Sequence, residues 1–519
     1  ANKLVKVVSE PGKKDIKPGE ELITVSRTVS AAAVAYETAR NAVEFRAEHL
    51  IRRATIERIL KRRVLTNPTG IGIGEALVRE LLWARYLDND GVPVRKIDDV
   101  QEVVNKYLAL RKEVLQGKSL TERNSISDWL IGIASCEIEK NLVPAPNREA
   151  LINFTYQTLQ KRIALPLESN QKTHDIQVYI AVHRGFALSD EAVTRFHLFA
   201  SFFPEWETLK TEDIHKMVSK FTEAYKEIEK QLNYPLKEQL RRFVIKEVAP
   251  FNVIRDLVES LGNDFARIAS EQELLEEKAR RILNKRYQET GTKLRRAAFR
   301  SIIYIFLTKM FFALILELPF DKIIGNTNYF ALVINTLFPP ALMFAVTASI
   351  KLPGEDNTRK ITQKIREYVF DDTASPTVVS VAMPPKTQIL GIGFTIIYLL
   401  TYLLIFGGII YLLRQFQFSI VSIAIFLFFL SVVSFFGYRV RGLTKDYELA
   451  QKERAFTPLI DFLFLPILRV GQWLSRELTQ INVLIFIFDF IIEAPFKAFF
   501  LIVEEWIRFM KAKKEEIIA

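Results

Sequence analysis

A few ionisable residues interrupt the long apolar runs of the C-terminal half and could do chemistry there. Lys309 lies near the middle of one apolar run, and Asp489, Glu493 and Lys497 follow one another at intervals of four residues. On a helix this interval places the three charges on one face, which could meet Lys309 inside a bundle as a polar site. In the plainer interpretation, which we favour, Lys309 reaches the nearer headgroups and the late helix lies flat at the interface.

A second candidate site surrounds two consecutive prolines. Pro339 and Pro340 lack the N–H groups that would bond the carbonyls four residues earlier, which belong to Asn335 and Thr336. A helix broken at this point would present free carbonyls beside two polar side chains, as in the small-cation sites of some transporters. A kink that neighbouring polar groups patch is the simpler alternative, and we favour it.

Sequence patterns typical of catalysis or metal binding are absent. Cys136 is the single cysteine, and the histidines at 174, 183, 197 and 215 lack the spacing of a helical metal pair. The glycine-rich stretch at 70–74 lacks the Lys-Ser/Thr of a phosphate-binding loop. We therefore expect no catalytic residue, no metal site and no cofactor, and an enzyme is disfavoured.

Composition divides the chain into two parts that suit different solvents. Of the 39 phenylalanines, 28 lie between Phe299 and Phe509, where large apolar side chains can face lipid. The formal net charge of +11 indicates an acidic surface nearby. Dense basic clusters flank the apolar runs, so we expect a bilayer with anionic headgroups as the partner and consider nucleic acid disfavoured.

The first part of the chain reads as packed helices. Residues 1–29 form a basic N-terminus that we expect to be flexible, and 30–263 a helical soluble domain. Within that domain we expect one long helix over 30–63 and another over 74–87, whose Leu77, Leu81, Leu82 and Trp83 face the core. Ser127-Asp128 and Ser189-Asp190 precede apolar runs and resemble helix N-caps. The predicted fold class is all-α throughout.

The second part contains four runs long enough to cross a bilayer, each of about 20 apolar residues. These runs are Ser301–Phe320, Tyr329–Ile350, Ile389–Leu413 and Phe418–Tyr438. We therefore predict a basic connecting helix over 264–300, a four-helix transmembrane domain over 301–438, and interfacial or re-entrant helices with a basic tail over 439–519. Whether four or six segments cross is left open.

The basic residues of the membrane half fall on one side of the predicted crossings. By the positive-inside rule this side is the cytoplasm, which makes the protein a multi-pass cell-membrane protein with both termini cytoplasmic. Residues expected to contact lipid headgroups are Arg295, Arg296, Arg300, Arg439, Arg441, Trp506, Arg508 and Lys511.

Two functions fit this organisation. In the first, which we favour, the protein is a membrane-anchored scaffold or adaptor whose helical cytoplasmic domain binds a protein partner. In the second, the membrane half is a small transporter or channel-like component that uses its intramembrane charged residues. The oligomeric state is left open.

Overall fold

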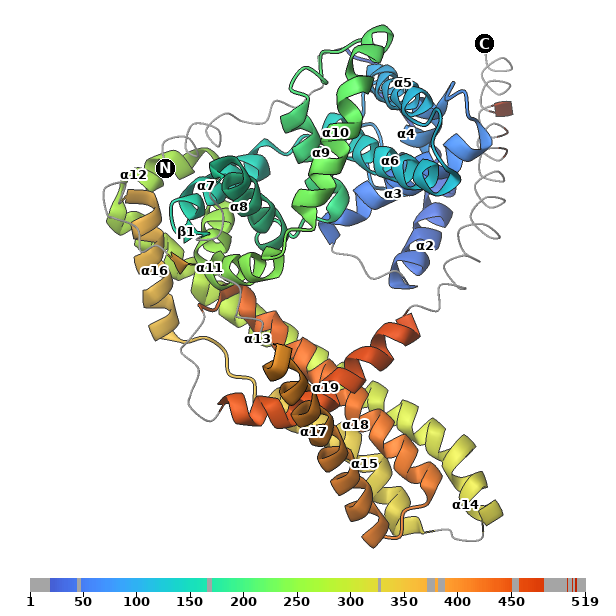
Figure 1. Ribbon diagram of the computed structural model, residues 1–519, viewed down its shortest axis with the longest axis vertical. Helices are drawn as coiled ribbons and strands as arrows, with labels where there is room; N and C mark the ends of the chain where they lie inside the picture. The colour runs from blue at the N-terminus through green and yellow to red at the C-terminus, as the bar shows by residue number, and fades with distance from the viewer. Residues whose placement is uncertain are drawn as a thin grey trace. The chain divides into compact units, whose positions relative to one another are not determined.

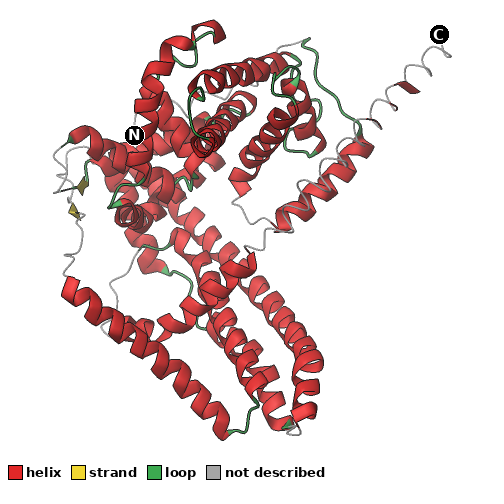
Figure 2. Ribbon diagram, turned by 45° about the vertical axis from the view of Figure 1, so that its right-hand side comes forward, coloured by secondary structure: helices red, strands yellow, loops and turns green. Residues whose placement is uncertain are grey.

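The computed structural model describes residues 19–43, 48–165, 170–324, 328–370, 379–380, 388–449 and 457–479, with 502, 506, 509 and 510. In these residues the regular structure is helical, apart from two strands of two residues each (Figure 2). The strands Ile163–Ala164 (β1) and Val379–Ser380 (β2) pair in parallel. The predicted all-α fold class is confirmed.

The described residues divide into two compact units. The helical unit lies in Glu10–Arg242 and Val378–Ser380 and includes the described residues 502, 506, 509 and 510. The other unit, which we name the membrane unit for its long apolar helices, lies in Phe243–Thr377 and Val381–Ile481. The division falls inside helix α11 (Lys237–Leu261), whose later part belongs to the membrane unit.

The helical unit packs its helices around one hydrophobic core. Buried side chains of this core include the predicted Leu77, Leu81, Leu82 and Trp83, all on α4. The helices of the unit are α2 (Arg27–Val43), α3 (Glu48–Thr66), α4 (Ile73–Trp83), α5 (Arg95–Val114), α6 (Leu120–Leu142), α7 (Pro146–Gln160), α8 (Gln171–Gly185), α9 (Glu191–Phe202) and α10 (His215–Leu232). The single helix predicted over 30–63 is described as α2 and α3, and residues 44–47 between them lie outside the described residues.

Local capping chemistry sets where two of these helices begin. The Asp190 carboxylate accepts a hydrogen bond from the Val193 N–H at 3.0 Å, so the predicted cap of α9 is confirmed. The predicted cap at Ser127-Asp128 is wrong, because both residues lie inside α6. That helix begins earlier, where Ser119 and Glu122 form a capping box.

The membrane unit contains four helices that are long and apolar enough to cross a bilayer. They are Gln272–Ile323, Tyr329–Ala348, Thr395–Gln415 and Ile420–Tyr447, and they contain or overlap the four predicted runs. The elements of the unit after α11 are α12 (Phe265–Ser270), α13 (Gln272–Phe312), the π-helical turn η3 (Ala313–Glu317), α14 (Leu318–Ile324), α15 (Tyr329–Ala348), α16 (Glu355–Phe370), α17 (Gln388–Gln415), α18 (Ile420–Arg441), the 3₁₀ segment η4 (Gly442–Tyr447) and α19 (Thr457–Thr479) (Figure 1).

The connecting helix predicted over 264–300 is divided into α12 and α13, with extended Glu271 between them, and α13 continues from Gln272 into the apolar run without a break. Helix α13 has 41 residues, which at ~1.5 Å per residue is about 60 Å. A hydrocarbon core of about 30 Å can hold only half of this length. In a bilayer, the charged first half of α13 would lie outside the hydrocarbon, and the apolar second half, from about residue 301, would lie inside.

Helix α18 is central in the membrane unit and α17 is peripheral. Half of the most apolar window of α18 is buried by protein, against 11% for α17. Glycines allow close packing on two sides of α18: Gly437 faces Val346 of α15, and Gly471 of α19 lies against the backbone of Ser431. The exposed leucines and isoleucines of α17 suit contact with acyl chains.

Polar side chains fasten the charged half of α13 to its neighbours in the membrane unit. Arg286 donates two hydrogen bonds to the Asp256 carboxylate of α11, at 2.7 and 2.9 Å, and Tyr447 of η4 donates a third at 2.7 Å. The Asn357 amide of α16 donates to the Tyr287 hydroxyl and to the Tyr447 carbonyl, both at 2.8 Å. These bonds connect the charged half of α13 and the segment η4 to α11 and α16.

Candidate functional sites

Lys309 does have a buried partner, and this partner lies on the same helical hairpin. Its ammonium donates a hydrogen bond to Glu317 Oε1, and both side chains are fully buried. The Phe429 ring of α18 lies 5.3 Å from Lys309 Nζ and adds a cation–π contact. Lys309 is therefore neutralised inside the bundle and does not extend to the surface as the favoured interpretation had it.

A π turn makes this pairing feasible. Residues eight positions apart on a regular α-helix lie about 80° apart around its axis, so Lys309 and Glu317 would not share a face. The π turn Ala313–Glu317 holds one extra residue and returns Glu317 to the face of Lys309. Pro319 follows this turn and has no N–H to donate, which favours a departure from α-helical bonding just before it.

Asn335 joins this ion pair from the neighbouring helix α15. Its amide nitrogen lies 2.6 Å from Glu317 Oε1 and 3.1 Å from the Ser422 carbonyl of α18. Both partners are acceptors, so the amide group must present its nitrogen to them. Glu317 Oε1 thus receives two donors, and Asn335 ties three helical segments together.

Several buried oxygens near this pair have no hydrogen-bond donor among the described residues. They are Glu317 Oε2, Asn335 Oδ1 and Asp321 Oδ1. Asp321 lies one helical turn beyond Glu317, and only 5% of its surface is exposed. We call Lys309, Glu317, Asp321 and Asn335 the intramembrane cluster. Buried acceptors without donors are rare enough in proteins to require an explanation.

Of the other predicted members of the polar site, three lie on α15 and three lie outside the described residues. Pro339 and Pro340 are buried inside α15, which continues through both, so the break considered there is wrong and the kink is the surviving interpretation. Thr336 is half-buried, on a different face from Asn335. Asp489, Glu493 and Lys497 lie outside the described residues, and their pairing stays a prediction.

The arginines expected at the headgroups have exposed side chains where the structure describes them. This holds for Arg295, Arg296 and Arg300 of α13 and for Arg439 and Arg441 at the end of α18. Trp506 is exposed as well, while Arg508 and Lys511 lie outside the described residues.

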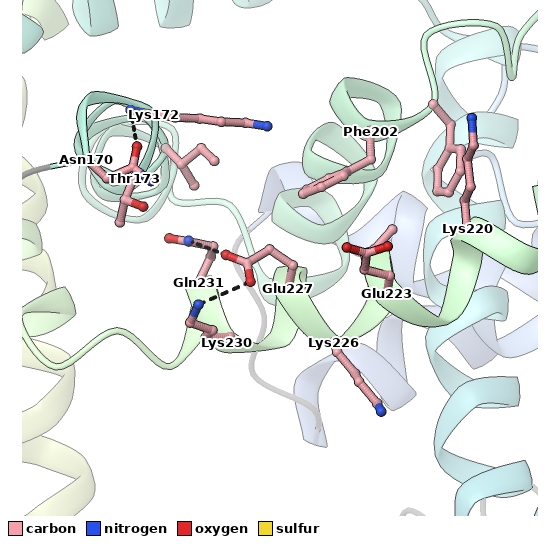
Figure 3. A pocket seen from close by; sticks show the side chains of 13 residues that line it. Asn170, Lys172, Thr173, Phe202, Lys220, Glu223, Lys226, Glu227, Lys230 and Gln231 are labelled. Atoms are coloured by element: carbon pink, nitrogen blue, oxygen red, sulfur yellow. Dashed lines mark hydrogen bonds and ion pairs between the residues drawn. The ribbon is translucent and has the colours of Figure 1, made fainter.

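A separate candidate site is a groove in the helical unit (Figure 3). It is about 630 Å³ in volume and is bordered by α8, the end of α9, and α10. Four lysines line it against two glutamates, and Phe202 and Phe203 supply its apolar floor. The basic residues are Lys172, Lys220, Lys226 and Lys230.

The lining of this groove carries more positive than negative side chains. Glu227 accepts hydrogen bonds from Lys230 at 3.2 Å and from Gln231 at 2.7 Å. Lys172 extends toward Phe202 (Figure 3), and its Nζ lies 5.6 Å from the ring centroid. The side chains of Lys172, Lys220 and Lys226 are exposed, as is that of Glu223, so the groove presents more cations than carboxylates beside Phe202. Such a surface complements acidic and apolar side chains together.

No family model matches the chain, and neither does any curated protein or solved structure. In the described residues, no group of three or more His, Cys, Asp or Glu side chains is placed to hold a metal ion. The two sites therefore have to be interpreted from their own chemistry.

Two of the scattered histidines do meet in the helical unit. The ring centroids of His183 and His197 lie 4.6 Å apart, and His183 Nδ1 is 3.1 Å from Ser189 Oγ. Burial, with the neighbouring His197, lowers the pKa of His183 to about 3. Burial, with nearby Lys140 and Arg148, lowers the pKa of His197 to about 4. Both histidines are therefore neutral in the folded unit at physiological pH.

We expect the helical unit to lose stability as the pH falls from about 6.5 toward 4. In this range the two histidines bind protons in the unfolded chain and stay neutral in the folded unit. Their contribution to the free energy of unfolding is therefore fully present above the unfolded pKa and declines as the pH falls below it. The expected slope is about 2 kcal/mol per pH unit. Denaturant unfolding of the full chain at several pH values, followed by tryptophan fluorescence, measures it. His183→Gln with His197→Gln should flatten the slope, whereas the exposed His215→Gln should not; an equal slope in both would refute this origin.

Proposed function

We propose that the protein is a membrane-anchored adaptor. Its membrane unit holds it in the bilayer, and its helical unit binds an acidic, partly apolar segment of another protein in the groove between α8, α9 and α10. The observation that supports this best is the set of exposed lysines around Phe202. Four candidate spans and the one-sided distribution of basic residues support a multi-pass arrangement, with the helical unit and both termini on the cytoplasmic side.

The transport alternative draws its support from the intramembrane cluster. Lys309 pairs with a carboxylate only eight residues away and lies in a packed bundle. A charge that is neutralised in this way stabilises a helical hairpin without any flux through it. The adaptor is therefore the function that we propose.

Charge reversal in the groove tests the adaptor directly. The probe is a fluorescein-labelled peptide of alternating Glu-Glu-Leu-Leu blocks, titrated with the full chain in detergent micelles. We expect the double variant Lys172→Glu with Lys220→Glu to bind the peptide at least about tenfold more weakly, because two attractive cations become repulsive anions. Added salt should weaken the binding of the peptide to the wild-type chain. Lys216→Glu, on the same helix as Lys220 but outside the groove, is the matched control. Absent binding by the wild type, or an equal loss in the control, would contradict the proposal.

A further inference from the structure

The intramembrane cluster has the composition of a cation site. We propose that Glu317, Asp321 and Asn335 bind one monovalent cation of the sodium class, at the end of the hairpin formed by α13, α14 and α15. This inference does not depend on the adaptor function, since it concerns other residues in the other unit.

The hydrogen bonds leave acceptor oxygens where a cation could use them. Lys309 and the Asn335 amide both donate to Glu317 Oε1, which leaves Oε2 as an acceptor without a donor among the described residues. The two bonds made by Asn335 Nδ2 fix the orientation of its amide group. They leave Asn335 Oδ1 without a donor among the described residues as well. Asp321 Oδ1 is the third such oxygen, one turn along the helix. Oxygen atoms alone are the ligand set of hard cations.

The net charge of the cluster favours a monovalent cation over a divalent one. By formal charge, Lys309 counts +1 and Glu317 and Asp321 count −1 each. A net charge of −1 in a water-poor, low-dielectric bundle is costly unless it is neutralised. A monovalent cation neutralises it, whereas a divalent cation would leave the opposite excess.

The cluster also lies within reach of water. Asp321 is three residues before the last residue of α14, Ile324, and the next residue, Lys322, is exposed. Asn335 is six residues from Tyr329, the first residue of α15, which is about 9 Å along that helix. A cation can therefore arrive from the aqueous end of the hairpin without crossing the hydrocarbon core.

Thermal unfolding of the purified full chain tests this site. The chain is held in detergent micelles in chloride salts of sodium, potassium or choline at equal ionic strength, and unfolding is followed by far-ultraviolet circular dichroism. A cation that binds only the folded state raises the midpoint, and we expect sodium to raise it by about 3 to 6 °C over choline. Asp321→Asn removes the negative charge that the cation would neutralise, keeps the Lys309–Glu317 pair, and should abolish that rise. Asp356→Asn, at an exposed aspartate of α16, is the control and should retain it.

Each other outcome would overturn the proposal. The same midpoint in sodium and choline would show that no cation binds. An equal rise in wild type and Asp321→Asn would place the cation elsewhere. Stabilisation by acidification, without any dependence on the cation, would identify a proton as the neutralising species.

Discussion

Replacing Glu317 with alanine is expected to destabilise the membrane unit by about 3 to 5 kcal/mol. The substitution leaves the Lys309 ammonium fully buried and beside the Phe429 ring, without its carboxylate partner. It also removes one of the two acceptors of the Asn335 amide. This loss is large because the charge has been taken out of water and can return to it only by disrupting the packing of α13 against α15.

A double substitution separates the ion pair from simple packing loss. Lys309→Met with Glu317→Met replaces both charges by flexible apolar side chains, and we expect it to recover most of the stability lost in Glu317→Ala. Unfolding by titration with choline dodecyl sulfate in sodium-free buffer measures the differences without a contribution from a bound sodium ion. Glu289→Ala, at a partly exposed ion pair of α13, should cost less than about 1 kcal/mol. A double variant no more stable than Glu317→Ala would show that lost packing or lost hydrogen bonds, and not the unpaired buried charge of Lys309, cause the destabilisation.

The fold class and the four apolar spans could be predicted because they depend on run length and composition. An uncharged run such as Tyr329–Ala348 has few alternatives to a buried or membrane helix. Helix starts were less predictable, because several polar residues compete for the role of the cap. Ser127 precedes an apolar run, whereas Ser119 is followed mostly by polar residues but has a glutamate three residues later to complete the capping box.

The intramembrane cluster could be predicted only in part. The cost of a charge in hydrocarbon singled out Lys309, and the prolines of α15 drew attention to Asn335. The sequence did not reveal Glu317 as the partner, because its spacing from Lys309 fits only when a π turn lies between them. The groove was missed altogether: Lys172 and Lys220 are far apart in sequence, and only the packing of α8 against α10 brings them to one cavity.

Cysteine labelling from outside intact cells tests most directly whether the four apolar helices cross a membrane with the basic segments on one side. Cys136 is the only native cysteine. Its thiol is buried, and burial raises its pKa, so it reacts poorly with maleimides and can be replaced by serine in the background. Lys322→Cys, Gln415→Cys and Gly354→Cys each place a thiol at an exposed position in a different connection.

We expect a membrane-impermeant maleimide to label Lys322→Cys and Gln415→Cys in intact cells. Gly354→Cys lies in the basic connection between α15 and α17, and we expect it to be labelled only after the membrane is permeabilised. Labelling of Gly354→Cys in intact cells, or release of the chain from membranes by alkaline carbonate without detergent, would contradict the proposed arrangement.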